Sequence, residues 1–148
     1  MRLSTKGRYA VMAMADLARQ GAERAVCLAE ISGRQDISLA YLEQLFARLR
    51  RAGLVSSVRG PGGGYRLARS AAQTVISDII IAADEPLHAT RCGPPGKEGL
   101  GCMPGGERCL THGLWEALGR EIHDFLAGVT LQDLLDGRFD HRAPAEAA

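Results

Sequence analysis

The chain has 148 residues, 46% of them hydrophobic, with 18 Lys and Arg against 17 Asp and Glu. This length suits about one domain, with a core that needs no disulfide bonds. No run of 18 apolar residues occurs, and Asp16 and Arg19 interrupt the apolar residues near the N-terminus. We therefore expect neither a membrane span nor a signal peptide, and a cytoplasmic location.

The net charge of +1 hides an uneven distribution of charge along the chain. Residues 1–70 hold 12 Lys and Arg and 5 Asp and Glu, a net charge of +7. Residues 71–148 hold 6 Lys and Arg and 12 Asp and Glu, a net charge of −6. Such a division is expected if the first half faces phosphate and the second half does something else.

The first half begins with three predicted helices. Apolar residues at helical spacing predict a helix over residues 5–20 and a short helix over residues 27–33, in which Cys27 is expected to be buried. A tight link leads to a third helix, which Ser38 can cap and Gly53 can end. The apolar face of this third helix consists of Leu39, Leu42, Leu45, Phe46 and Leu49.

Two short strands, residues 54–58 and 65–68, are predicted on either side of the glycine-rich stretch from Gly60 to Gly64. Helices followed by a basic hairpin are typical of a winged helix-turn-helix, which we place at residues 1–70. The alternative is the phosphate-binding loop of an enzyme. It is disfavoured because no GxxxxGK[ST] motif occurs and because the glycines precede a strand rather than a helix.

The second half is predicted to be helical around an irregular loop. Residues 71–89 form a connecting helix, centred on residues 74–84, and residues 90–112 form a loop rich in glycine and proline. Residues 113–136 hold a long helix that Gly128 ends and a short last helix that opens with a capping box. Residues 137–148 are expected to be a disordered tail. The predicted fold class is mainly α with a small β-hairpin wing.

Four potential metal ligands lie in the loop, in a C-x9-C-x6-C-x2-H array formed by Cys92, Cys102, Cys109 and His112. Three soft thiolates and an imidazole suit zinc or an iron–sulfur cluster, and a glycine-rich backbone can wrap around either. Structural disulfides need an oxidising compartment, which nothing in the sequence indicates. The spacing alone does not separate zinc from an iron–sulfur cluster.

Several segments together closely resemble the IscR family of bacterial iron–sulfur cluster regulators, among them MRLSTKGRYAV, ISLAYLEQLFARLRRAGLVSSVRGPGGGYRLA and RCLTHGLW. The resemblance covers about residues 1–135, although the intervals between the cysteines are longer here. It implies a homodimeric winged-helix transcription factor that represses iron–sulfur cluster assembly genes when its cluster is present. The implied cofactor is a [2Fe–2S] cluster, bound by Cys92, Cys102, Cys109 and His112.

Two alternatives to this reading are a nitric-oxide- or iron-responsive regulator of the same larger family and a cluster-bearing electron carrier. The related nitric-oxide sensors use an aspartate of the first helix as a ligand, where this sequence has Arg8. No nucleophile–base pair or nucleotide-binding fingerprint stands out in the sequence. We therefore expect neither an enzymatic activity nor a small-molecule substrate.

DNA contacts are predicted at the start of the third helix and in the wing. Gln44 can bond bidentately to adenine, Glu43 can accept from the amino group of cytosine, and Arg59 can enter the minor groove. The predicted set is Ser38, Ala40, Tyr41, Glu43, Gln44, Arg59 and Gly62. We expect ligation of the cysteine loop to order it beside the first and third helices and so to change DNA binding.

A dimer is predicted to form through the apolar stripe of the long helix, and a two-fold dimer predicts pseudo-palindromic operators. The stripe consists of Leu114, Trp115, Leu118, Ile122 and Phe125.

Overall fold

The computed structural model describes residues 4–21, 23–87, 90, 92 and 102–139. Residues 91 and 93–101 of the predicted loop (90–112) and residues 140–148 of the predicted tail (137–148) therefore lie outside the described residues. No helix of the described part is long and apolar enough to cross a membrane. The elements are, in order, α1 (Thr5–Gln20), α2 (Leu28–Gln35), α3 (Leu39–Arg51), β1 (Val55–Val58), β2 (Gly64–Leu67), the 3-10 turn η1 (Ala71–Gln73), α4 (Ile76–Ala82), α5 (His112–Ala127) and α6 (Leu131–Asp136).

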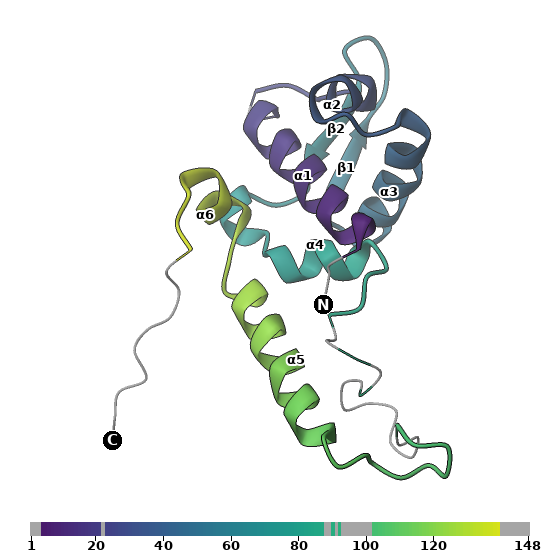
Figure 1. Ribbon diagram of the computed structural model, residues 1–148. Coiled ribbons are helices and arrows are strands. Elements are labelled where there is room, and N and C mark those ends of the chain that lie inside the picture. The colour runs from purple at the N-terminus through teal and green to yellow at the C-terminus, as the bar shows by residue number, and fades with distance from the viewer. Residues whose placement is uncertain (1–3, 22, 88–89, 91, 93–101, 140–148) are drawn as a thin grey trace.

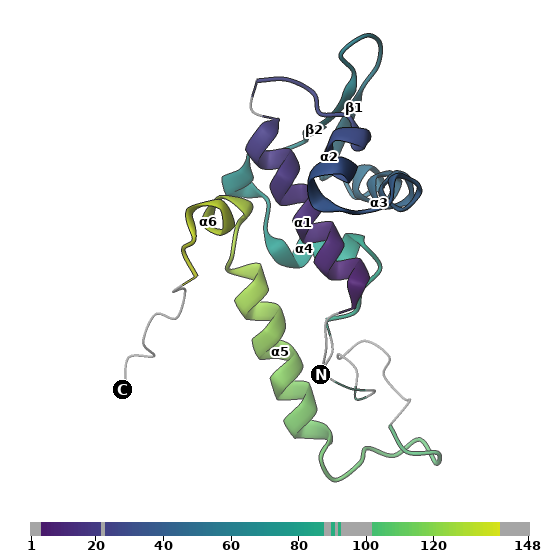
Figure 2. The same ribbon diagram turned by 45° about the horizontal axis from the view of Figure 1, so that its top comes forward.

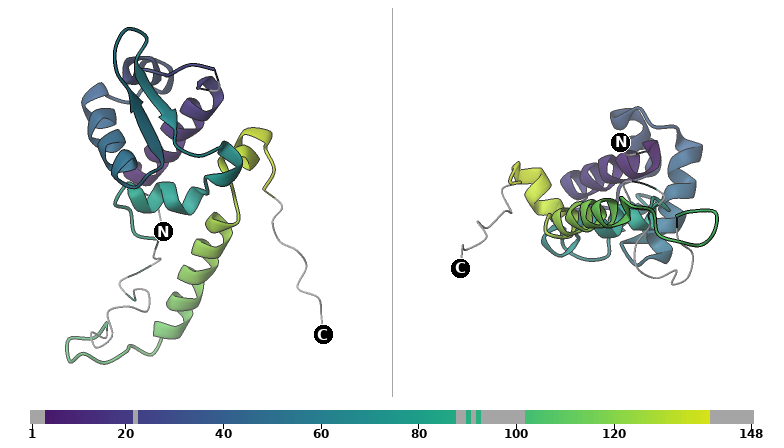
Figure 3. Two further views of the ribbon diagram at one scale, coloured as in Figure 1. Left: turned by 180° about the vertical axis from the view of Figure 1, so that it is seen from behind. Right: turned by 60° about the horizontal axis from the view of Figure 1, so that its bottom comes forward.

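The first three helices and the hairpin pack into one unit, with the loop between β1 and β2 projecting beyond the helices (Figure 1). Seen from behind, the two strands lie across the helices (Figure 3). This arrangement confirms the predicted winged helix-turn-helix and the mainly α fold with a small hairpin. Its core combines side chains of α1, α3, α4 and α6, among them Met14, Leu17, Phe46, Leu49, Ile79 and Leu131, which are all fully buried.

The start of α2 departs from the prediction at Cys27. Val26 exchanges two backbone hydrogen bonds with Tyr65 of β2, with N···O distances of 3.0 and 2.8 Å. Because this pairing keeps the chain extended, Cys27 is the N-cap of α2 rather than part of it. Its side chain is half-buried, so the prediction of a buried cysteine inside the helix is wrong.

The third helix follows the prediction except at its first residue. The hydroxyl of Ser38 accepts a hydrogen bond from the backbone N–H of Tyr41, and Gly53 has the left-handed φ of 72°. Four of the five predicted apolar residues are buried, but Leu39 is 42% exposed. Leu39, the first residue of α3, is therefore not part of the core.

The second half is arranged around α4, which packs against α1. It is shorter than the helix predicted around residues 74–84, because Val75 is extended and pairs with Thr130 and because Asp84 has a left-handed φ of 62°. The predicted capping box is confirmed, since the Thr130 hydroxyl accepts from the N–H of Asp133 and the Asp133 carboxylate accepts from the N–H of Thr130.

Helix α5 runs away from the winged helix, as the views in Figures 1 and 2 both show.

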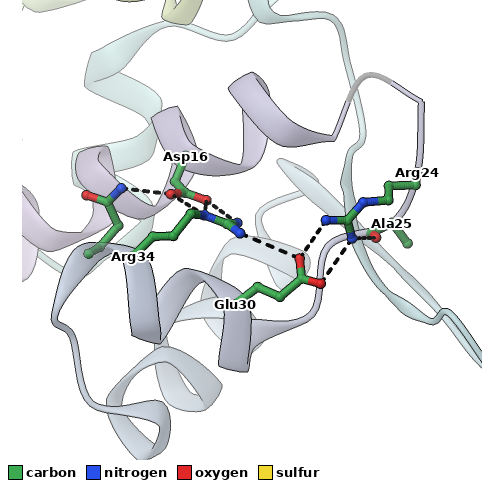
Figure 4. A network of polar contacts seen from close by, with 6 residues as sticks. Asp16, Arg24, Ala25, Glu30 and Arg34 are labelled. Atoms are coloured by element: carbon green, nitrogen blue, oxygen red, sulfur yellow. Dashed lines mark hydrogen bonds and ion pairs between the residues drawn. The ribbon is translucent and has the colours of Figure 1, made fainter.

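An ion-pair network joins α1 to α2 (Figure 4). The carboxylate of Asp16 is buried and accepts three hydrogen bonds from the guanidinium of Arg34, at 2.7 to 3.2 Å, and one from the amide of Gln35 at 2.7 Å. Glu30 continues the network to Arg24. Burial raises the pKa of Asp16, but the bonds from Arg34 and Gln35 outweigh it and hold this pKa below its ordinary value.

We predict that Gly64→Ala destabilises the wing strongly. A Cβ atom at this position would lie 2.3 Å from the carbonyl oxygen of Val26, and the φ of Gly64 is 154°. Both the clash and the backbone conformation disfavour a side chain, so the free energy of unfolding should fall by about 2–4 kcal/mol in urea titrations. Gly62→Ala is the matched control, because its φ is also positive but the space around it is open. Its expected loss is about 1–2 kcal/mol, and equal losses would contradict the clash.

The Asp16–Arg34 pair predicts a pH-dependent contribution to stability. A carboxyl group with a lowered pKa stabilises the fold above its ordinary pKa of about 3.9, and this contribution is lost as the pH falls toward the folded-state value. Asp16→Asn should therefore lower the free energy of unfolding by about 2–4 kcal/mol at pH 7. The difference from the wild type should shrink below about pH 4.

Urea titrations from pH 7 to pH 3 measure this difference. Glu30→Gln is the control, because its carboxylate is solvated and should contribute much less. A loss for Asp16→Asn that is the same at both ends of the pH range would show that the charge of Asp16 is not responsible.

Candidate functional site

All four predicted metal ligands meet near the start of α5. The Sγ atoms of Cys92 and Cys109 lie 3.7 Å apart, and the Sγ atom of Cys102 lies 3.4 Å from Nδ1 of His112. The ligand atoms of Cys92, Cys102 and His112 all lie within 4.8 Å of one another. The structure thus brings the four candidate ligands together.

Local turns bring three of these ligands together. Between Cys102 and Cys109 the chain reverses, with hydrogen bonds from Met103 N to Glu107 O and from Gly106 N to Met103 O, and Gly106 has a φ of 83°. The backbone N–H of Cys109 then donates to the Sγ atom of Cys102 at 3.0 Å. One further turn, closed by a 3.0 Å bond from His112 N to Cys109 O, places the imidazole in the first turn of α5.

The thiols of this group differ in their acidity. Burial raises the pKa of Cys92, which is 8% exposed. Hydrogen bonds with the side chains of Cys102 and Thr111 lower the pKa of Cys109 to about 7. Cys109 is therefore readily deprotonated near neutral pH, as a metal ligand must be.

The donor set selects among the possible metals. Thiolates and an imidazole, with no carboxylate in the group, suit zinc, copper or an iron–sulfur cluster rather than magnesium or calcium. The donors also form two close pairs, Cys92 with Cys109 and Cys102 with His112. Two pairs suit a two-iron cluster in which each iron takes two protein ligands, although one zinc ion can also use four such donors.

Among the described residues, the metal-ligand group lies away from α3. Helix α5 begins at His112, and this end of the helix points away from α3 and the wing (Figure 1). The reason is the direction of α5, which the sequence pattern does not specify. A connection to the winged helix must therefore run through the segments that join the two.

Such a connection exists at the end of α4, in the part of the chain that precedes Cys92. The guanidinium of Arg48 in α3 donates to the carbonyl oxygen of Ala83 at 3.3 Å. The carboxylate of Glu85 accepts from the backbone N–H of Ser4 at 3.0 Å and from its hydroxyl. Sequence reasoning missed these residues, because contacts between positions so far apart in the chain leave no periodic signal. We refer to residues 83–85 as the α4 junction.

Most of the predicted DNA-contacting residues are accessible. Ala40, Glu43 and Gln44 are exposed near the start of α3, and Arg59 and Gly62 are exposed in the loop of the wing. Ser38 is also exposed, with its hydroxyl engaged in capping α3. Tyr41 is half-buried and packs edge-on against Tyr9, with 5.8 Å between the ring centroids, so packing holds its ring in place.

A winged helix-turn-helix in which the second helix of the motif, here α3, is exposed is the fold of a DNA-binding regulator. The sequence matches the Rrf2 family, described as iron-dependent transcriptional regulators, over residues 3–137, and the chain belongs to this family. Members of this family are regulators of transcription, not enzymes.

Individual relatives agree with the family match. HTH-type transcriptional regulator IscR of Xenorhabdus nematophila is 57% identical over 135 residues, which cover 91% of this chain and 79% of the relative. The solved structure of T. potens IscR has a TM-score of 0.73 at 39% identity and covers 93% of this chain and 88% of that one. CymR, the global cysteine regulator of B. subtilis, has a TM-score of 0.74 at 31% identity, with 93% and 98% covered.

Proposed function

We propose that this protein is a cytoplasmic transcriptional regulator whose affinity for DNA depends on a [2Fe–2S] cluster bound by Cys92, Cys102, Cys109 and His112. The observation that carries the proposal is the convergence of these four donors in two close pairs. The iron dependence that describes the family favours iron over zinc at this site. When bound, the cluster supplies a redox-active centre, and histidine ligation raises its potential relative to all-cysteine ligation.

The α4 junction supplies the route from the metal site to DNA. Cys92 comes after the junction in the chain, whereas the other three ligands belong to the start of α5 and the turns before it. Ligation therefore fixes the segment after the junction against α5. Arg48 and Ser4 hold the junction to α3 and α1. A change in the chain after the junction therefore biases the position of α3, the helix that is predicted to contact the DNA bases.

We also propose that the protein acts as a homodimer on pseudo-palindromic operators and represses iron–sulfur cluster assembly genes when the cluster is present. The apolar stripe of α5 supports the dimer, since Leu114 is 62% and Phe125 45% exposed. A partner that covers this stripe removes apolar surface from water. A two-fold dimer places its half-sites about 34 Å apart along DNA.

The cofactor is tested by visible absorption together with iron, sulfide and zinc analysis of protein purified without oxygen. We expect about two irons and two sulfides per chain, with visible bands that bleach on reduction, because each iron takes two of the four protein ligands. Cys92→Ala should lose the bands, while Cys27→Ala, which lies outside the site, should keep them. Stoichiometric zinc without visible bands would contradict the cluster and leave the fold unaffected.

DNA binding is tested with duplexes that the cluster-bound protein selects from a random library. Gln44→Ala should weaken binding to the selected duplexes about tenfold to a hundredfold, because a bidentate contact to a base contributes about 1–3 kcal/mol. Its salt dependence should stay unchanged, whereas Arg59→Ala should reduce the slope of log K against log salt by about one, because it removes one cation from the DNA interface.

Gln20→Ala is the matched control for Gln44→Ala, since Gln20 is also exposed but is the last residue of α1 and was not predicted to contact DNA. Equal affinity of the wild type and Cys92→Ala for every selected duplex would contradict the dependence on the cluster. Failure of the wild type to enrich any duplex would favour a cluster-bearing electron carrier instead.

A further inference from the structure

Thr111 stands at the N-cap position of α5 without capping the helix. A threonine at this position ordinarily accepts a hydrogen bond from an N–H of the first turn, but here the side chain makes no such bond. Its Oγ1 atom instead accepts from the indole Nε1–H of Trp115 at 3.1 Å. The same oxygen lies 3.6 Å from the Sγ atom of Cys109, a proposed cluster ligand.

The direction of these hydrogen bonds follows from the groups involved. An indole N–H can only donate, so it occupies a lone pair of Thr111 and leaves the hydroxyl proton for another acceptor. A metal-bound thiolate carries no proton and can only accept. The bonds therefore run from Trp115 to Thr111 and from Thr111 to Cys109, and each bond in such a chain polarises the next.

We propose that Thr111, oriented by Trp115, donates a hydrogen bond to the Cys109 ligand sulfur and raises the reduction potential of the cluster. This inference rests on the proposed function. A hydrogen bond to a ligand sulfur stabilises the more negative, reduced cluster more than the oxidised one, because the reduced cluster places more charge on its sulfurs. Thr111 is thus a tuning residue, and Trp115 is a positioning residue that acts through it.

The test compares three variants of the full chain, each loaded with cluster: Thr111→Val, Thr111→Ser and Trp115→Phe. Their midpoint potentials are measured by redox titration, followed through the visible bands. Valine keeps the shape of threonine without the hydroxyl, so its potential should fall. The expected fall corresponds to a roughly three- to tenfold less favourable one-electron reduction, or about 30 to 59 mV.

The other two variants separate the hydroxyl from the packing of the side chain. Thr111→Ser keeps the donor and should have the wild-type potential, while Trp115→Phe should shift the potential in the same direction as valine by a smaller amount. Because Thr111 does not cap α5, its replacement by valine should leave the helix content unchanged in circular dichroism. Trp115 is the only tryptophan, so its emission maximum should shift in Thr111→Val and not in Thr111→Ser.

The outcomes distinguish this inference from the proposed function. A wild-type protein that binds no iron overturns both proposals. A wild-type protein with its cluster and a Thr111→Val protein of unchanged potential overturn the role of Thr111 alone. If Thr111→Val does not retain the cluster, Trp115→Phe decides, and an unchanged potential in that variant overturns the proposal.

Discussion

The burial of α1 is the constraint on which the rest of the fold depends. This helix packs against α2, α4, α6 and β2, so it contacts both halves of the chain. Small residues on it, Gly7, Ala10 and Ala13, are buried and allow neighbouring helices to approach closely, while Met14 and Leu17 fill the core. Helix α4, which leads toward the metal-ligand group, is thus packed directly on the DNA-binding unit.

Polar contacts complement this packing at both ends of α1. The Asp16–Arg34 pair fixes the later part of α1 to α2, the first helix of the helix-turn-helix. The contact between Ser4 and Glu85 fixes its beginning to the α4 junction. A hydrogen-bonded group specifies an orientation that apolar packing alone leaves loose, so these contacts set how α1 and its neighbours are aligned.

Features encoded by neighbouring residues could be predicted from the sequence. The bounds of α1, the capping box at Thr130 and the cap at Ser38 depend on local hydrogen bonds and apolar spacing, and each is present. Long-range contacts could not be predicted in this way. The backbone pairing of Val26 with Tyr65 decided where α2 begins, and the course of α5 decided where the metal-ligand group lies.

The metal-ligand group shows the same division between local and long-range information. The array of cysteines and histidine predicted which residues converge, because a turn and a C-x2-H step bring three of them together locally. The role of the Thr111 side chain was not predictable. A threonine before a helix indicates a cap, and only the position of Trp115 one turn later redirects its hydroxyl toward the sulfur of Cys109.

The origin of the four ligands explains how such a group can act at a distance from DNA. Cys102, Cys109 and His112 belong to one local unit at the start of α5, whereas Cys92 arrives from the α4 junction. In the proposed function, filling the site would connect α5 to residues 83–85, which contact α1 and α3. In the proposed dimer, α5 would carry the interface, so this connection would set the orientation of each winged helix relative to its partner. That orientation determines which spacing of half-sites the two recognition helices can reach together.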